Sequence, residues 1–289
     1  MKYYKHHILF FLFFLFFLLL GIYLYIISIT KDGFNNNTHN YGIIFAGTVK
    51  NVENYIQNAL NNIEKCGKKF NTFSVVIYEN DSTDKTRDIL VENKKANYHY
   101  IFEDNVAEGR RTMRIANGRN KILQKVKEIN QNNQYTYLIM MDLDDVNASG
   151  EFINSIDSCF AHDINNWDVL TGNQKEKYYD IWALRKNGII EYDCWGELGK
   201  SISQDKTNVI YEIIGNTHFD KSADLIEVDS AFGGIAIYKL AAIQNCEYVG
   251  EHLNDEYPDH SEHCEHVEFH KCIKKNGGKM YINSEFYTD

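Results

Sequence analysis

Short apolar runs alternate with helix-like patterns through the first half of the chain. Four runs have the length of buried strands: 41–46, 73–78, 99–102 and 137–141. Between them, apolar residues recur at helical spacing over 52–63 and 112–129, and a shorter helix passes through Ile89, capped by Ser82 or Thr83. Strands joined by crossover helices form a parallel sheet covered on both faces. We therefore expect an α/β fold with a mostly parallel central sheet flanked by helices.

The apolar run Tyr137–Met141 ends abruptly in acids. Asp142, Asp144 and Asp145 follow it within four residues. Carboxylates at the end of a buried strand repel each other and lose hydration unless a cation joins them. A divalent metal ion is one interpretation. An acidic turn that faces water is the alternative.

Polar residues also follow the other predicted strands. Thr48 comes just after the first strand, and Glu79–Asp84 follows the second. The carboxyl ends of parallel strands lie at one edge of a sheet, and ligands of such sheets bind outside that edge. Thr48, the Glu79–Asp84 turn and the Asp142–Asp145 acids are therefore predicted to share one site.

The second half of the chain is less regular. The pattern predicts short strands at 167–171 and 178–184, a strand after Gly233-Gly234, a helix over 262–275 and a last strand at 281–286. The paired glycines indicate close approach of the backbone to a ligand. No internal repeat or linker divides residues 41–289, so we interpret them as one catalytic domain.

The net charge of −10 and the absence of a dominant basic patch argue against nucleic acid as a partner. A metal–diphosphate ligand remains compatible, because arginines crowd one short segment. They are Arg110, Arg111, Arg114 and Arg119. Arginine binds phosphate through paired hydrogen bonds, and Arg114 and Arg119 are the preferred contacts; a solvated helix face is the alternative.

The N-terminus predicts a membrane anchor. Residues 8–29 carry no charge and are rich in Phe and Leu, which is long enough for a transmembrane helix. Lys2 and Lys5 precede this run, so residues 1–7 are predicted to be a cytosolic tail. Residues 30–40 form a short stem. A cleaved signal peptide is the rival, but the bulky residues 23–27 do not suit a cleavage site. The expected topology is a single-pass type II protein with its catalytic domain in the ER or Golgi lumen, or in the equivalent compartment for a viral protein.

Six cysteines are present, and none forms a CxxC pair. An oxidising compartment would permit disulfides whose connectivity the sequence does not give. We expect Cys66 and Cys159 to be buried free thiols.

Five segments in order resemble the GT-A class of nucleotide-sugar glycosyltransferases, of the family-2-like or capsule mannosyltransferase-like kind. These segments are Glu79–Thr86, Arg114–Asn120, Asp142–Asp145, Phe232–Gly234 and Glu265–Phe269. They are similar to the nucleotide-binding turn, the R-x-A-x-x-R-N segment, the D-x-D motif and the later G-G and E-D/E-H elements. The resemblance covers most of residues 41–289 and implies a GT-A fold.

The resemblance also implies roles for single residues. Asp144 would meet Mn²⁺ or Mg²⁺ directly, Asp142 would contact the metal through water or the ribose, and His270 would complete the metal shell. Glu79 and Asp81 would hold the base and ribose of a UDP- or GDP-sugar; a capped, solvated turn is the alternative. Thr48, Gly233 and Gly234 would also line the donor site.

The same resemblance places the catalytic base at the start of the last predicted helix. Glu265 or His266 stands where the family has its acid pair, and this departure leaves inverting or retaining stereochemistry open. His266 and His270 lie four residues apart, so a structural zinc site is an alternative, although the cysteine spacing matches no common finger.

The expected activity is transfer of a hexose from a nucleotide sugar to a hydroxyl of a glycan, protein or lipid. Two alternatives remain from the sequence. A sugar-phosphate nucleotidyltransferase has a related sheet, but it usually opens with a longer Gly-rich loop than Gly47–Lys50. A degenerate, non-catalytic nucleotide- or carbohydrate-binding module is the other, and the intact acids and arginines argue against it.

Overall fold

The computed structural model describes residues 39–106, 109–200, 202–251 and 262–288. The predicted tail, transmembrane segment and most of the stem lie outside these residues. The first strand begins at His39, two residues before the predicted start of the domain. Within the described ranges, no helix is long and apolar enough to cross a bilayer.

The described residues build an eight-stranded sheet in the order β3-β2-β1-β4-β7-β5-β8-β6. Its strands are β1 His39–Val49, β2 Phe70–Asn80, β3 Tyr98–Glu103, β4 Tyr137–Met141, β5 Val169–Asn173, β6 Leu225–Glu227, β7 Ile235–Lys239 and β8 Met280–Tyr287. The first four strands are parallel, as predicted. β7 runs antiparallel between β4 and β5, and β6 is an antiparallel edge strand. The prediction of a mostly parallel α/β sheet is thus confirmed.

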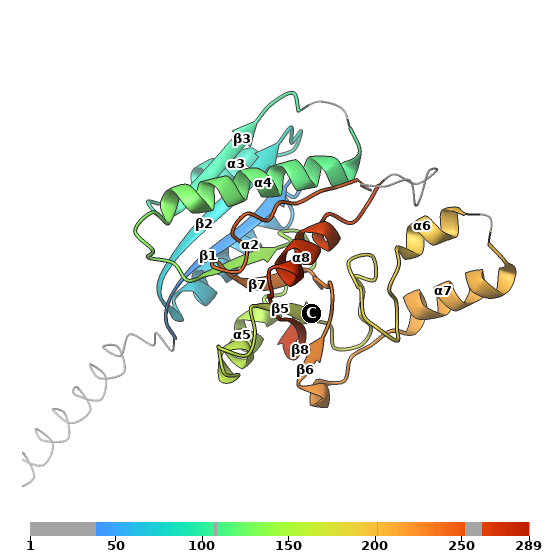
Figure 1. Cartoon of the computed structure of the whole chain (residues 1–289). Helices are drawn as coiled ribbons and strands as arrows, with labels where there is room; N and C mark the ends of the chain where they lie inside the picture. Colours follow the sequence, from blue (N-terminus) through green and yellow to red (C-terminus); the bar gives the residue numbers. More distant parts are fainter. Residues whose placement is uncertain (1–38, 107–108, 201, 252–261, 289) are drawn as a thin grey trace, which may run out of the picture. The chain divides into compact units, whose positions relative to one another are not determined.

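Helices cover both faces of this sheet (Figure 1). The helices are α2 Ile56–Gly67, α3 Thr86–Glu92, α4 Arg111–Ile129, α5 Glu151–Ala161, α6 Cys194–Gly199, α7 Gln204–Asn216 and α8 Glu265–Lys275, with a 3₁₀ turn η1 at Lys221–Ala223. α4 and α8 pack on one face, and α2, α3 and α5 pack on the other. The α6–α7 pair projects from the body of the domain (Figure 1).

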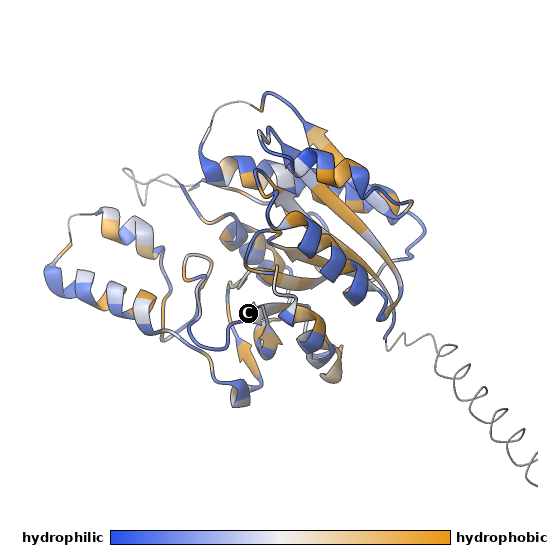
Figure 2. Ribbon diagram, turned by 180° about the vertical axis from the view of Figure 1, so that it is seen from behind, coloured by the Kyte–Doolittle hydropathy of each residue, from blue (hydrophilic) through white to orange (hydrophobic). Residues whose placement is uncertain are grey.

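Side-chain alternation along the strands produces the two cores. In β1, Ile44 and Ala46 belong to the core beneath α4, whereas Ile43 and Phe45 belong to the core beneath α2. Successive side chains of a strand point to opposite faces, so a strand buried on both sides must be apolar throughout. Figure 2 shows the central strands largely in the hydrophobic colour, while the helices carry both colours.

Two local predictions were wrong. Neither Ser82 nor Thr83 caps α3; Lys85 precedes the helix, and no side chain caps it. Residues 178–184 form an irregular segment with a turn at 181–183 rather than a strand. Its Tyr178 N–H donates to the carbonyl of Thr217 and not to a neighbouring strand (2.9 Å).

The cysteines divide into one disulfide and four thiols. Cys246, in the segment after β7, is bonded to Cys272 of α8. Cys66 and Cys159 are buried free thiols, as predicted, and Cys194 and Cys264 are buried thiols too. The disulfide holds the segment that follows β7 against the helix whose N-terminus reaches the site described next.

Candidate active site

A cavity of about 550 Å³ lies at the carboxyl edge of the parallel strands. Its walls come from residues 48–52 at and after the end of β1, the end of β2, α4, the acids after β4, residues 179–182 and the start of α8. The sequence predicted that these strand ends would converge. Seven of the predicted site residues line this cavity: Thr48, Arg114, Arg119, Asp142, Asp144, Glu265 and His266.

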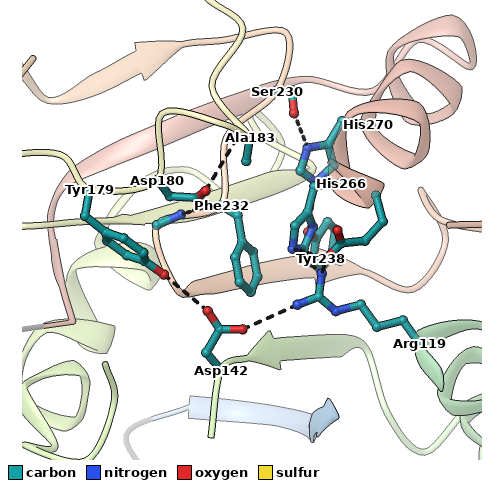
Figure 3. A network of polar contacts seen from close by, with 12 residues as sticks. Arg119, Asp142, Tyr179, Asp180, Ala183, Ser230, Phe232, Tyr238, His266 and His270 are labelled. Carbon is teal, nitrogen blue, oxygen red and sulfur yellow. Dashed lines mark hydrogen bonds and ion pairs between the residues drawn. The ribbon is translucent and has the colours of Figure 1, made fainter. Parts of the chain in front are cut away.

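Asp142 lies between two side chains that reach it from opposite sides (Figure 3). The Tyr179 hydroxyl donates to Oδ2 at 3.2 Å, and Arg119 Nη2 lies 3.4 Å from Oδ1. Loss of hydration in the cavity raises the pKa of Asp142 to about 7; Arg119 opposes this rise, and three neighbouring carboxylates add to it. Those carboxylates are Asp144, Asp180 and Glu265. The protein therefore does not fully compensate the negative charge of Asp142.

Asp144 lies in the same cavity with even less compensation. The Val146 N–H donates to its Oδ1 at 3.3 Å, and no Lys, Arg or His of the described chain forms an ion pair with it. Burial and the adjacent Asp145 raise the pKa of Asp144 above its ordinary value. Asp145 itself is exposed and does not line the cavity.

Arg119 of α4 is buried at the centre of the site. Its Nη1 donates to Glu265 Oε1 and to His266 Nε2, and Nη2 approaches Asp142. The guanidinium also lies over the Phe232 ring, 5.1 Å from its centroid. Arg119 is thus neutralised by carboxylates of the protein itself and holds two acids in place.

Arg114, five residues earlier on α4, differs from Arg119. It lines the cavity, donates to the Gly109 carbonyl and forms no ion pair within the described ranges. Lys50 and Arg111 line the cavity as well. These three cations are available to an anion, so Arg114 fits the predicted phosphate role better than Arg119 does.

His266 is not suited to the predicted role of proton acceptor. An arginine can only donate, so Nε2 of His266 accepts from Arg119 and its proton sits on Nδ1. The ring stacks on Phe232 with centroids 3.8 Å apart. Burial, Arg119 and His270 lower the pKa of His266 well below its ordinary value. The imidazole therefore stays neutral with its lone pair occupied, and only Glu265 remains of the predicted pair.

The prediction that His270 binds the metal does not fit the structure. His270 is fully buried and does not line the cavity. Its Nδ1 is 2.9 Å from Ser230 Oγ, and its Nε2 is 2.9 Å from the Tyr238 hydroxyl. Both ring nitrogens are occupied, so neither can ligate an ion. His266 and His270 lie four residues apart because both face the core from the same side of α8.

Glu79 and Asp81 do not reach the cavity either. Glu79 is fully buried; Arg87 Nε donates to one carboxylate oxygen and the Ser82 N–H donates to the other. Asp81 accepts from the N–H of Asn105 at 2.7 Å and shapes a turn. Asn80, between them, does line the cavity. The predicted base and ribose contacts of Glu79 and Asp81 thus become structural roles in this turn.

Gly233 and Gly234 bring the start of β7 against the end of β4. Both have positive φ, and a Cβ on Gly234 would lie 2.5 Å from a methyl of Val146. The Gly234 carbonyl accepts from the Asp142 N–H at 2.9 Å. The glycines therefore position Asp142 through backbone contacts and do not themselves line the cavity.

The lining residues that sequence reasoning missed include Tyr179, Asp180 and Trp182. Asp180 Oδ2 accepts from the Gly233 N–H at 3.2 Å, and its Oδ1 accepts from the Ala183 N–H at 3.4 Å. The signal was a single acid inside an otherwise aromatic and aliphatic run, Tyr178–Leu184. Because the pattern of that run predicts a strand, Asp180 does not stand out in the sequence as a site residue.

The residues present fit a divalent cation in one specific way. In the described part of the chain, no three His, Cys, Asp or Glu side chains converge to hold an ion on their own. Asp142 and Asp144 nevertheless supply hard oxygen donors in a cavity with too little positive charge. Mg²⁺ and similar ions are commonly held by one or two carboxylates together with phosphates of the substrate. A metal here would therefore bind together with a diphosphate.

Comparison with known proteins gives structural neighbours only. No family model matches the sequence, and no curated protein matches it. TarS of S. aureus in complex with UDP-GlcNAc is 16% identical, with a TM-score of 0.48, over 85% of this chain and 57% of that one. A mannosyltransferase of Pyrobaculum calidifontis in complex with GDP-Man and Mn²⁺ is 12% identical, with a TM-score of 0.47, over 86% and 56%.

Glucosyl-3-phosphoglycerate synthase of Mycobacterium tuberculosis in complex with UDP is 10% identical, with a TM-score of 0.40, over 71% of this chain and 59% of that one. These neighbours are glycosyltransferases, and this chain spans less than two thirds of each. What they bind is a property of those proteins. The function proposed below rests on this chain's own residues.

Proposed function

We propose that this protein is a membrane-anchored, metal-dependent glycosyltransferase that moves a hexose from a UDP- or GDP-sugar to a hydroxyl of a glycan, protein or lipid. One observation carries the proposal: Asp142 and Asp144 share a cavity with Arg111 and Arg114. Acids for a cation and bases for phosphates in one cavity suit a metal–diphosphate ligand. The five motifs in order support the same substrate class.

The reaction that fits this cavity is a displacement at the anomeric carbon. The acceptor oxygen forms a bond to that carbon, the bond to the diphosphate breaks, and the nucleoside diphosphate leaves with the electron pair. A bound divalent cation supplies Lewis-acid stabilisation of the diphosphate charge. The proton of the acceptor hydroxyl must pass to a base of the protein.

The chain's own residues position these groups. Asp142 and Asp144 would hold the ion, and Arg114 would pair with phosphate oxygens. Thr48 and Asn80 line the cavity at the ends of β1 and β2, where a nucleoside would extend. Arg119 holds Glu265 and Asp142 in place through its two ion pairs.

The membrane topology belongs to the proposal as well. The apolar residues 8–29 and the lysines before them support a type II anchor. The Cys246–Cys272 disulfide supports a lumenal catalytic domain, because disulfides persist in oxidising compartments. Protease added to sealed microsomes should leave the catalytic domain intact. Cleavage from the cytosolic side would overturn the topology and leave the catalytic proposal standing.

The activity is tested with the full-length protein in detergent. A panel of UDP- and GDP-sugars is supplied with Mn²⁺, and release of nucleoside diphosphate is measured. We expect turnover of at least one donor, its loss on chelation with EDTA, and its recovery when Mn²⁺ is restored. Calorimetry should show that UDP or GDP binds only together with the metal. If no nucleoside diphosphate binds under any condition, the transferase proposal fails.

A further inference from the structure

The site contains a carboxylate that none of the family-like motifs includes. Asp180 lies in the irregular segment between β5 and α6, 38 residues after Asp142 in the sequence. It lines the same cavity as Glu265 and Asp142. Figure 3 shows it on the same side of Phe232 as Tyr179, away from His266 and His270.

The two residues first expected to serve as base are already engaged. His266 has its lone pair occupied by Arg119. Glu265 forms an ion pair with the same guanidinium, and both side chains are buried. Protonating Glu265 would remove the charge that compensates a buried arginine, which is costly. Proton uptake at Glu265 therefore opposes the arrangement that holds the site together.

Asp180 has the opposite surroundings. Two backbone N–H groups fix its orientation, and no Lys, Arg or His within the described ranges forms an ion pair with it. Each carboxylate oxygen keeps a lone pair for a further hydrogen bond, since a carboxylate accepts about four. Asp180 can thus accept a hydrogen bond from an incoming hydroxyl without losing a partner.

We propose that Asp180 binds the acceptor hydroxyl and takes its proton as the acceptor oxygen attacks the donor sugar. This inference rests on the proposed transferase function and assigns its missing base. The acceptor O–H bond breaks, its proton moves to an Asp180 oxygen, and the oxygen's electron pair forms the new bond to the anomeric carbon. The nucleoside diphosphate departs with the other electron pair, so no further reagent is needed.

The electrostatic surroundings suit this role. Burial and the charge of Glu265 raise the pKa of Asp180 to about 6, while the Gly233 and Ala183 amides and Arg119 oppose the rise. A base is most effective when its pKa lies near the working pH. The other titratable groups facing this region are Asp142, Tyr178, Tyr179 and Cys264. None of these adds positive charge, so they do not weaken the basicity of Asp180.

Asp180→Asn tests the inference in the full-length enzyme with Mn²⁺ and the donor found active above. Asparagine keeps the shape and one acceptor oxygen but cannot take the proton. We expect kcat for transfer to fall by about 10²–10⁴-fold, the range for loss of a general base, with UDP or GDP affinity unchanged by calorimetry. Asp88→Asn, on the exposed first turn of α3, is the matched control and should retain wild-type kcat.

A second variant separates chemistry from shape. Asp180→Ala opens space beside the acceptor hydroxyl, and added formate should raise the transfer rate of this variant at least tenfold. The inference is wrong if Asp180→Asn keeps its kcat, if formate restores nothing, or if Asp180→Asn loses nucleotide binding, which would mark a purely structural residue. The proposed function fails separately, through a wild-type enzyme that neither binds nor turns over nucleotide sugars.

Discussion

Two acidic strand ends lie on the same sheet edge and are built in opposite ways. At the end of β2, Glu79 is paired with Arg87, and Asp81 accepts N–H groups that lower its pKa. At the end of β4, Asp142 and Asp144 lack sufficient positive charge, and burial raises the pKa of both. The sequence resemblance assigned ligand contacts to both. Only the second contributes carboxylates to the cavity.

The difference shows how a structural acid is told from a binding acid. A carboxylate whose charge is compensated within the protein, by an ion pair or by several N–H donors, stabilises its own turn and gains less from a bound cation. A carboxylate that lacks nearby positive charge is stabilised when a cation binds. The cation then supplies the charge compensation that the folded protein does not. The following experiments challenge this distinction.

The largest contrast is expected in activity. Asp144→Asn removes a charge that has no ion-pair partner in the described chain, so kcat/KM should fall by about 10²–10³-fold, as for loss of one key electrostatic contact. The nucleotide-sugar assay with Mn²⁺ measures it. Asp81→Asn, at the other strand end, should change kcat/KM less than tenfold. Equal losses in the two variants would contradict the distinction.

The second contrast is in stability and runs the other way. Glu79→Gln breaks a buried, charge-assisted hydrogen bond to Arg87, and we expect a loss of about 2 kcal/mol in the free energy of unfolding. Urea denaturation monitored by circular dichroism measures this loss. Asp144→Asn should cost nothing in the same experiment. A stable Glu79→Gln protein would show that the β2 pair is not structural.

The smallest contrast is in the pH dependence of stability without metal. The folded-state pKa of Asp142 is raised to about 7 from an ordinary value of 3.8, so the folded state binds the proton more tightly. Stability should therefore fall as pH rises from about 4 to 7, and level off above. Asp142→Asn should flatten this slope and raise the Tm at pH 8 by about 2–4 °C, corresponding to roughly 1 kcal/mol.

For Asp81, the contribution to stability changes with pH in the opposite direction. Its pKa is lowered by the Asn80 side chain and by backbone amides, so its contribution is present above its unfolded pKa and is lost as pH falls below it. Thermal scans of Asp81→Asn and wild type should thus converge at low pH. An Asp142→Asn protein that is less stable than wild type at pH 8 would contradict the interpretation of this strand end.

The sequence predicted the parallel half of the fold well, for a physical reason. A strand buried on both faces is apolar along its whole length, so β1, β2 and β4 were visible from local pattern alone. Residues 178–184 misled the same reasoning. Their aromatic and branched side chains suit a strand, but the backbone partner of Tyr178 is Thr217, far along the chain. Local pattern does not contain such a contact.

The site was predicted in part for the same reason. Asp142, Asp144 and Arg114 follow from strand ends and helix position, which local sequence encodes. The occupation of His270 by Ser230 and Tyr238 depends on segments more than thirty residues away. Asp180 likewise has no ion-pair partner in the described chain because of how distant segments pack, which local sequence does not encode. Residue type and spacing gave the candidates, and their partners in space decided between them.

The antiparallel β7 has a consequence for how such a protein can diverge. After β5 the chain runs through α6, α7 and the edge strand β6 before it reaches Gly233 ahead of β7, where Gln174 Nε2 donates to the Gly233 carbonyl at 3.0 Å. The end of β5 and the residues just before β7 are therefore adjacent, and the projecting α6–α7 pair lies in the chain segment between them (Figure 1). Lengthening or replacing that pair leaves the strand register of β4, β5 and β7 intact. Exchange of that pair would therefore alter the surface of the domain while the strand ends that carry Asp142 and Asp144 stay as they are.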